Sequence, residues 1–402
     1  SLTMKRFFHE PYGLYLIILL LLTLFCNSCK KQPLDVDLDI PIYNIEELNK
    51  YLISDTVTSL CGSAANAVCD DQGNVYCVYL GSKTGYGEQS GDLRTSIFNL
   101  NDLSTIHHYR CVYNGERVNK TGLVQFCFEP TIILKSDKTG ARIIFEGHIQ
   151  GFETYNIFYR DIDINGNLSD IYPVYIQKKN SLLPISRTII NQYLTDHGFS
   201  PLNSIYSIHI TSKITTAAEE QYGCITSTVM PPIVFKGTKD CSVLSLMSIL
   251  ASDCHHESSI ELHNYQAYSV IRDGRGINIA TLNAELKADN IWHIPLTATQ
   301  RPQLFTLNGI MYLGCPYTLA RLPNRFSPQI SPSRCIISIS QVKQDAITDK
   351  MLLYSKLGLV YPAFIIYKSR LYMIFSDGSR FPTKTTQGKD CLWLIQMPSI
   401  TK

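Results

Sequence analysis

The pattern that decides the fold reads Pro130-Thr-Ile-Ile-Leu followed by Gly140-Ala-Arg-Ile-Ile-Phe. It recurs as Pro302-Gln-Leu-Phe with Gly309-Ile-Met-Tyr-Leu, and as Pro362-Ala-Phe-Ile-Ile with Arg370-Leu-Tyr-Met-Ile-Phe. Each copy has an opening proline, an apolar strand, a tight turn and a second strand rich in branched or aromatic residues. Repetition of a hairpin unit along one chain is typical of radial or solenoid architectures.

Working outward from these hairpins, strand-like runs fall into six groups. The groups span residues 64–113, 130–177, 204–235, 243–282, 302–340 and 351–396. Units of four strands favour a β-propeller. We therefore predict an all-β fold, a six-bladed β-propeller of four-stranded antiparallel blades over residues 59–402. A pair of β-sandwiches with β-rich linkers is the alternative, and the one clear helical pattern covers Ser186–Phe199.

Composition excludes several classes of protein. The chain has 402 residues, of which 45% are hydrophobic, so it is not a disordered chain. A formal net charge of +2 gives no footprint for nucleic acid. His255 and His256 are adjacent and would point to opposite faces of a strand, and no cysteine–histidine spacing fits a metal. We expect no metal, no cofactor and no nucleic-acid partner.

The N-terminal segment predicts export. Lys5 and Arg6 precede a short apolar run, Leu14–Phe25, which suits a signal peptide better than a membrane span. The run is followed by Cys26-Asn-Ser-Cys29-Lys-Lys, which resembles a bacterial lipoprotein signal with Cys29 as the lipidated residue. An ordinary secretory signal or a short anchor is the alternative. The resemblance implies a lipid-anchored protein of the bacterial cell envelope, on the periplasmic or surface face of the outer membrane.

The expected domain organisation follows from this segment. Residues 1–28 form the signal peptide, 29–58 a tether with a short helix near 45–52, and 59–402 the propeller. Of 13 cysteines, an odd number remains beyond Cys29, so they do not all pair within the chain. Bridges between Cys69 and Cys77 or between Cys111 and Cys127 are conceivable, but we expect few disulfides.

Chemistry-bearing residues gather in the second half of the chain. Glu257 opens a strand and Arg272 closes the next one, so a hairpin with its turn at His263-Asn264 brings both to one end of a sheet. Arg334 starts a later strand in Ser331-Pro-Ser-Arg-Cys-Ile-Ile. Tyr361 stands just before the last repeat, in Leu359-Val-Tyr-Pro-Ala-Phe.

This order of Glu, Arg, Arg and Tyr resembles the exo-α-sialidase family, whose members are six-bladed propellers. The resemblance implies that Tyr361 is the nucleophile and Glu257 its base, while Arg272 and Arg334 hold the carboxylate of an acidic sugar. Arginine binds carboxylates through fork-like, charge-assisted hydrogen bonds. A neutral tyrosine avoids the repulsion that a carboxylate nucleophile would meet from that sugar, and sialidases use tyrosine for this purpose.

Two parts of the family pattern differ here. The strand that supplies a third arginine in the family reads Cys61-Gly-Ser-Ala-Ala-Asn-Ala-Val, without arginine. The loop that carries the family's acid/base aspartate reads Gly87-Glu-Gln-Ser-Gly-Asp-Leu-Arg, which makes Asp92 the candidate acid and Arg94 a candidate replacement arginine. The repeated Asp-box motif of the family does not occur here in its complete form.

Three functions are compatible with these residues. The first is a sialidase-like glycoside hydrolase that releases terminal sialic acid or a related acidic sugar. The second is a propeller lipoprotein that binds glycans without cleaving them. The third is a propeller glycosidase or lyase for another acidic sugar, which would account for two arginines in place of three.

Overall fold

The computed structural model describes one compact unit within residues 40–319 and 327–402. The described residues are 40–59, 61–82, 91–118, 122–199, 208–210, 213–227, 229–250, 257–273, 276–295, 301–316, 335–344, 346–356, 358–377 and 391–400. Among them, no helix has the length and apolar character needed to cross a membrane. Cys29 and Arg334, which the sequence singles out, lie outside the described residues.

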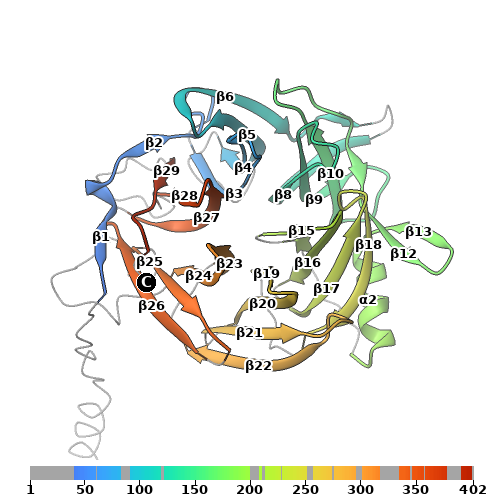
Figure 1. Cartoon of the computed structure of the whole chain (residues 1–402). Helices are drawn as coiled ribbons and strands as arrows, with labels where there is room; N and C mark the ends of the chain where they lie inside the picture. The colour runs from blue at the N-terminus through green and yellow to red at the C-terminus, as the bar shows by residue number, and fades with distance from the viewer. Residues whose placement is uncertain are drawn as a thin grey trace, which may run out of the picture. The chain divides into compact units, whose positions relative to one another are not determined.

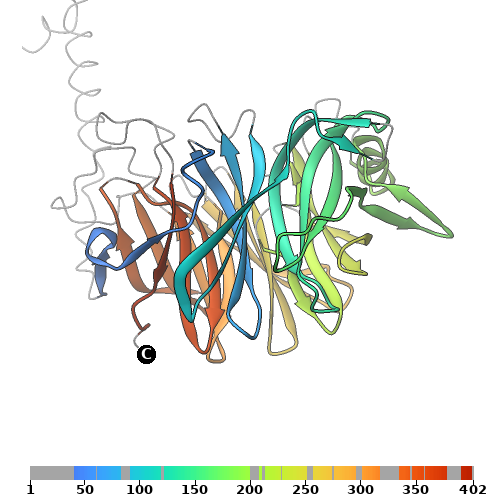
Figure 2. The ribbon, with the colours of Figure 1, turned by 90° about the horizontal axis from the view of Figure 1, so that it is seen from above.

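The described strands form six sheets arranged around one axis (Figure 1 and Figure 2). The first sheet contains β3 (Cys61–Cys69), β4 (Asn74–Ser82), β5 (Asp92–Asn99) and β6 (Asp102–Val112). The second contains β7 (Arg117–Val118), β8 (Gly122–Leu134), β9 (Ala141–Ile149), β10 (Asn156–Ile162) and β11 (Tyr172–Pro173). The third contains β12 (Tyr175–Lys178), β13 (Ser181–Pro184), β14 (His209–Ile210), β15 (Thr215–Ala217), β16 (Glu220–Ser227), β17 (Met230–Thr238) and β18 (Val243–Ile249).

The other three sheets complete the ring. The fourth contains β19 (Ser258–His263), β20 (Gln266–Asp273), β21 (Gly276–Leu282) and β22 (Ala288–Pro295). The fifth contains β23 (Gln303–Leu307), β24 (Ile310–Pro316), β25 (Ile336–Val342), β26 (Ile347–Tyr354) and β1 (Ile42–Asn44). The sixth contains β27 (Val360–Tyr367), β28 (Arg370–Ser376), β29 (Leu392–Gln396) and β2 (Lys50–Leu52).

These sheets confirm the all-β propeller, with corrections to the blades. Three sheets have four strands, but the others have five, five and seven, and two pairs, β1–β26 and β12–β18, are parallel. The strand at Val243–Ile249 belongs to the third sheet, and Met351–Tyr354 is the end of β26 in the fifth. The sequence pattern predicts both one group later, because strand spacing alone does not show which neighbour a strand pairs with.

Residues 42–52 contribute to the propeller, although the sequence predicts a tether and a short helix there. β1 pairs with β26, β2 pairs with β29, and only the single 3-10 turn Ile45–Glu47 lies between them. Ile45 is fully buried. The two short strands cover the outer edges of the fifth and sixth sheets, and an uncovered edge would offer unpaired backbone groups to other chains.

The predicted helix is confirmed as α2 (Arg187–Asp196). Ser186 caps its start by accepting a hydrogen bond from the backbone N–H of Ile189 at 3.3 Å. Ile190 and Leu194 are its buried face.

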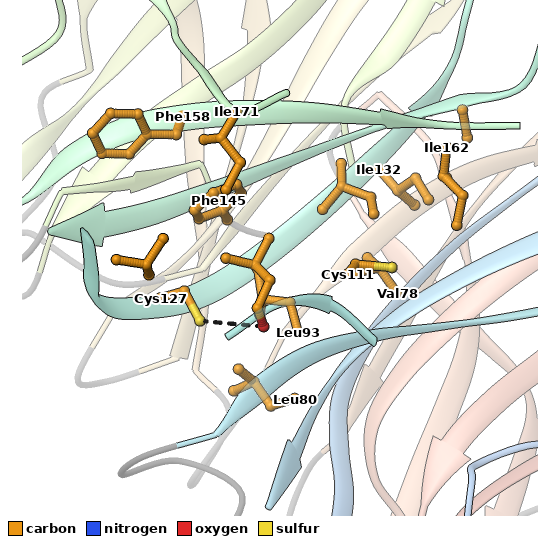
Figure 3. Packing of buried hydrophobic residues seen from close by; sticks show 14 of the residues in the cluster. Val78, Leu80, Leu93, Cys111, Cys127, Ile132, Phe145, Phe158, Ile162 and Ile171 are labelled. Carbon is orange, nitrogen blue, oxygen red and sulfur yellow. Dashed lines mark hydrogen bonds between the residues drawn. The ribbon is translucent and has the colours of Figure 1, made fainter. Parts of the chain in front are cut away.

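Neighbouring sheets are held together by apolar side chains that alternate along the strands. Figure 3 shows this packing between the first and second sheets, where Leu80 and Leu93 of the first sheet and Phe145 and Phe158 of the second belong to one buried cluster. Cys127 belongs to the same cluster, and burial raises the pKa of its thiol to about 12. Cys77, Cys111, Cys127, Cys224, Cys241 and Cys315 are buried free thiols. They pack as small hydrophobic residues.

The innermost strands are β3, β8, β14 with β15, β19, β23 and β27 (Figure 1). Contacts join β3 to β8, β8 to β14, β15 to β19, β19 to β23, β23 to β27 and β27 to β3, and both β14 and β15 pair with β16 in the third sheet. A cavity of about 760 Å³ is lined by the later halves of these strands, including Val68, Leu134, Glu261 and Ile366. Other residues of these strands, which do not line this cavity, form a different centre.

Candidate active site

Four innermost strands share one unusual backbone feature, a left-handed residue within the strand or just before it. Ala64, Glu129, Arg301 and Tyr361 have φ values of 54°, 41°, 33° and 51°. In β3, β8 and β27 the ladder skips two residues at this point, and β23 begins two residues after Arg301. A left-handed backbone at residues other than glycine is strained, and such strain concentrates at functional sites.

The sequence explains why the strands bulge there. Glu129, Arg301 and Tyr361 are each followed by proline. Proline has no N–H for a ladder hydrogen bond and is tolerated at strand starts and bulges. It also disfavours the right-handed helical region for the residue before it. The opening prolines of the repeated pattern therefore mark the positions where a side chain is turned out of the ladder.

Arg301 lies at the middle of these positions and is only 2% exposed. Its Nη2 contacts Oε2 of Glu129 at 2.6 Å, and its Nη1 donates to the carbonyl of Ala65 at 3.4 Å. Its Cζ lies 5.0 Å from the ring centroid of Tyr361. One guanidinium therefore joins β8, β3 and β27 to the start of β23.

Glu257, the residue before β19, completes the group. Its Oε2 accepts from Nη1 of Arg272 at 2.8 Å and from the backbone N–H of Arg301 at 2.9 Å, and its Oε1 lies 3.7 Å from Nε of Arg301. Burial raises the pKa of Glu257, but the two guanidiniums and the backbone N–H together outweigh it and lower the pKa below its ordinary value. The ionised form of the Glu257 carboxyl is therefore stabilised in the folded protein.

The hairpin β19–β20 places Glu257 and Arg272 together. Its turn is Asn264-Tyr265, with φ of 49° and 62°, one residue later than the sequence predicts. The register pairs Ser258 with Ile271, so the residues just outside this pair meet at the same end. Arg272 donates its backbone N–H to the carbonyl of Glu257 at 3.0 Å. The Arg272 side chain remains 33% exposed, so it faces solvent as well as Glu257.

Asp92 and Arg94 belong to another group of ion pairs, at the start of β5. Asp92 accepts from Arg110 at 2.7 and 3.0 Å, and it lies 3.3 Å from Arg94. Arg94 is 5% exposed and also binds Asp55 at 3.1 Å and Thr58 at 2.6 Å. The guanidinium of Arg94 is thus used to fasten the segment before β3 to the first sheet. The roles assigned to Asp92 and Arg94 from the sequence stay predictions.

Of the six candidate catalytic and substrate-binding residues, the structure gathers Glu257, Arg272 and Tyr361 around Arg301. Sequence reasoning missed Arg301 and Glu129. The signal was present, because both precede the opening proline of the repeated pattern, as Tyr361 does. The residue before each opening proline is therefore the position by which Arg301 and Glu129 could be identified from the sequence.

The centre brings together groups that can transfer protons and a group that can bind an anion. It contains two carboxylates, Glu129 and Glu257, a phenol, Tyr361, and one partly exposed guanidinium, Arg272. Arg301 is enclosed by its partners and holds the others in place. Groups of three or more histidine, cysteine, aspartate or glutamate side chains that could hold a metal ion do not occur in the described part of the chain.

No family model and no curated protein matches the chain by sequence. Solved structures share its fold. A protein of unknown function from Dyadobacter fermentans aligns with a TM-score of 0.58 and 9% identity, over 87% of this chain and 98% of that one. The NanB sialidase from Streptococcus pneumoniae aligns with a TM-score of 0.51 and 8% identity, over 86% of this chain and 70% of that one.

The Trypanosoma rangeli sialidase in complex with sialic acid is similar as well. It aligns with a TM-score of 0.51 and 7% identity, over 88% of this chain and 58% of that one. At such identities the likeness concerns the fold alone. The chain is an all-β propeller that has the fold of sialidases.

Proposed function

We propose that this protein is a sialidase-like glycoside hydrolase that releases terminal sialic acid or a related acidic sugar from glycans. Each of the six sheets is taken as one blade. The observation that carries the proposal is the convergence of Glu257, Arg272 and Tyr361, from the fourth and sixth sheets, around Arg301. The fold shared with sialidases supports it.

The chemistry follows from the residue types. The phenolic oxygen of Tyr361 bonds to the anomeric carbon while the glycosidic bond breaks, and Glu257 takes the phenolic proton. Arg272, with Arg334, holds the substrate carboxylate. In this scheme Asp92 gives a proton to the leaving oxygen, for which it must give up its ion pairs with Arg94 and Arg110. Water then hydrolyses the tyrosyl–sugar bond and restores the groups.

The test is release of fluorophore from a sialoside by purified residues 30–402 and by Tyr361→Phe. The phenylalanine ring keeps the contact with Arg301 but lacks the nucleophilic oxygen, so activity should be lost while the melting temperature stays close to that of the wild type. Equal release by the variant would remove Tyr361 from the proposal. No release by the wild type would remove the sialidase activity.

A second candidate, glycan binding without cleavage, is favoured by the state of Glu257. A carboxylate whose pKa is lowered by Arg272 and Arg301 is a weak base for a phenol. Binding to sialylated glycans without turnover, equal in the wild type and Tyr361→Phe, would support this candidate. The third function is a glycosidase or lyase for another acidic sugar. It predicts turnover when a fluorogenic uronic-acid glycoside replaces the sialoside in the assay.

We further propose that Cys29 carries a lipid that anchors the protein in the bacterial cell envelope, on the periplasmic or surface face of the outer membrane. The motif Cys26-Asn-Ser-Cys29 after an apolar run supports this. Cells grown with labelled palmitate should incorporate label into the protein and not into Cys29→Ser. Absence of label from the wild type would overturn the anchor.

A further inference from the structure

A buried acid–base pair lies beside the centre and has no part in the mechanism above. His209 is the first residue of β14, and Glu146 lies on β9. Nδ1 of His209 is 3.2 Å from Oε2 of Glu146. The side chains are 3% and 0% exposed, so water does not screen the pair.

The position of His209 matches that of the other central residues. β14 edges the third sheet at the axis and contacts both β8 and β9. His209 stands at the start of its innermost strand and Glu257 just before β19, while Glu129 lies on β8, which β14 contacts. From β16, its neighbour in the ladder is Thr226, which is uncharged.

Three carboxylates act on His209. Burial lowers its pKa, but the hydrogen bond and charge of Glu146 and the charges of Glu129 and Glu257 raise it above the ordinary value. The pKa of Glu146 is also raised, by burial. Both members thus hold protons to higher pH than usual, and the pair titrates as one unit. A buried ionisable pair costs stability compared with apolar residues, which makes a functional role worth testing.

The charges of the centre nearly cancel. Glu129 and Glu257 carry two negative charges, and Arg272 and Arg301 carry two positive ones. With one shared proton the His209–Glu146 pair is neutral, so the whole group is neutral. When that proton leaves, the group gains one negative charge in a poorly solvated place, where charges interact strongly.

We propose that His209, held by Glu146, is a positioning residue. It sets the net charge of the side chains around Arg301, so that an acidic sugar binds more weakly as the pH rises. The inference rests on the proposed function, because it concerns an anionic ligand of the same site. While the pair keeps its proton, a ligand carboxylate meets a neutral group of side chains around Arg301. After the proton leaves, the ligand meets a group with one negative charge.

The experiment measures the dissociation constant of N-acetylneuraminic acid by calorimetry from pH 5 to 9. N-acetylglucosamine serves as the uncharged probe. The wild type should lose affinity for the acid, but not for the uncharged sugar, by roughly five- to tenfold across the titration of the pair. In Glu146→Gln the buried imidazole has lost the carboxylate that stabilises its proton, so the proton leaves at lower pH and the fall in affinity should shift to lower pH. In His209→Gln the step should move, because the imidazole that shares the proton is gone.

His197→Gln is the matched control, since it removes an exposed histidine from the end of α2 and should keep the wild-type profile. Circular dichroism of each variant checks that it is folded. If one of the two variants, Glu146→Gln or His209→Gln, does not fold, the other one still tests the inference. If Glu146→Gln or a folded His209→Gln keeps the wild-type profile, the inference falls while the proposed function stands. If the wild type does not bind the acid at any pH, both fall.

Discussion

The guanidinium of Arg301 lies over the ring of Tyr361, with Cζ 5.0 Å from the ring centroid. The two residues come from the starts of neighbouring innermost strands, and each precedes a proline and has a left-handed backbone. A cation over a desolvated aromatic face is stabilised by the ring's negative charge density. Because Arg301 also binds Glu129 and Glu257, this contact fixes Tyr361 relative to both carboxylates.

Arg301→Ala should destabilise the protein by about 3–5 kcal/mol, because it leaves Glu129 and Glu257 without their buried cation. Urea unfolding followed by tryptophan fluorescence measures the loss. The control is Arg110→Ala, whose guanidinium is 44% exposed and pairs with Asp92 at the surface, and it should cost no more than about 1 kcal/mol. Equal losses in the two variants would show that Arg301 does not hold the centre together.

Ala64→Gly tests the strain in the innermost strand of the first sheet. Glycine adopts a φ of 54° without the steric cost that alanine meets, so the relief should offset the loss of about 0.5–1 kcal/mol that glycine normally brings. Ala65→Gly is the control, since Ala65 is equally buried and has no left-handed backbone. We expect Ala64→Gly to be more stable than Ala65→Gly by about 1 kcal/mol in thermal unfolding. The reverse order would argue against strain at Ala64.

Glu257 should make stability depend on pH in the acid range. Its folded pKa lies below the ordinary value of 4.5, so its contribution is complete above about pH 4.5 and is lost as the pH falls through the folded pKa. Compared with Glu257→Gln, the wild type should be more stable by about 3 kcal/mol at pH 7, with a gap that narrows toward pH 3. Unfolding by urea at a series of pH values measures the gap. Glu285→Gln, an exposed control, should show no such gap, and a constant gap for Glu257→Gln would contradict the assignment.

The strands β1 and β2 should be needed to cover the outer edges of the fifth and sixth sheets. A chain that begins at Ile53 lacks β1 and β2, so it exposes the edges of β26 and β29. We expect a lower melting temperature and concentration-dependent aggregation, because open strand edges pair with other chains. A chain that begins at Ile40 is the reference. Light scattering and calorimetry compare the two, and identical behaviour would show that the N-terminal strands are dispensable.

The local parts of the fold could be read from the sequence. The repeated hairpins, the alternation of apolar residues and the capped helix at Arg187–Asp196 all depend on neighbours within a few residues. The meeting of Glu257 and Arg272 is of the same kind, because one hairpin with a short turn fixes it. Such features follow from backbone geometry and side-chain period alone.

The grouping of strands into sheets was only partly predictable. The sequence placed Val243–Ile249 and Met351–Tyr354 with the wrong neighbours and treated residues 42–52 as a tether. These strands pair across loops or across nearly the whole chain. The identity of such a partner depends on which edges remain open once the other strands have paired.

By itself the sequence determined the strands, their hairpins and the all-β propeller, because those depend on residue type and period. Only the tertiary structure placed Arg301 against Glu129, from which it is separated by 172 positions, and against Tyr361. It also buried His209 beside Glu146. The physical reason is that these contacts join separate sheets, and the closing of six sheets around an axis decides which side chains share the small space at its centre.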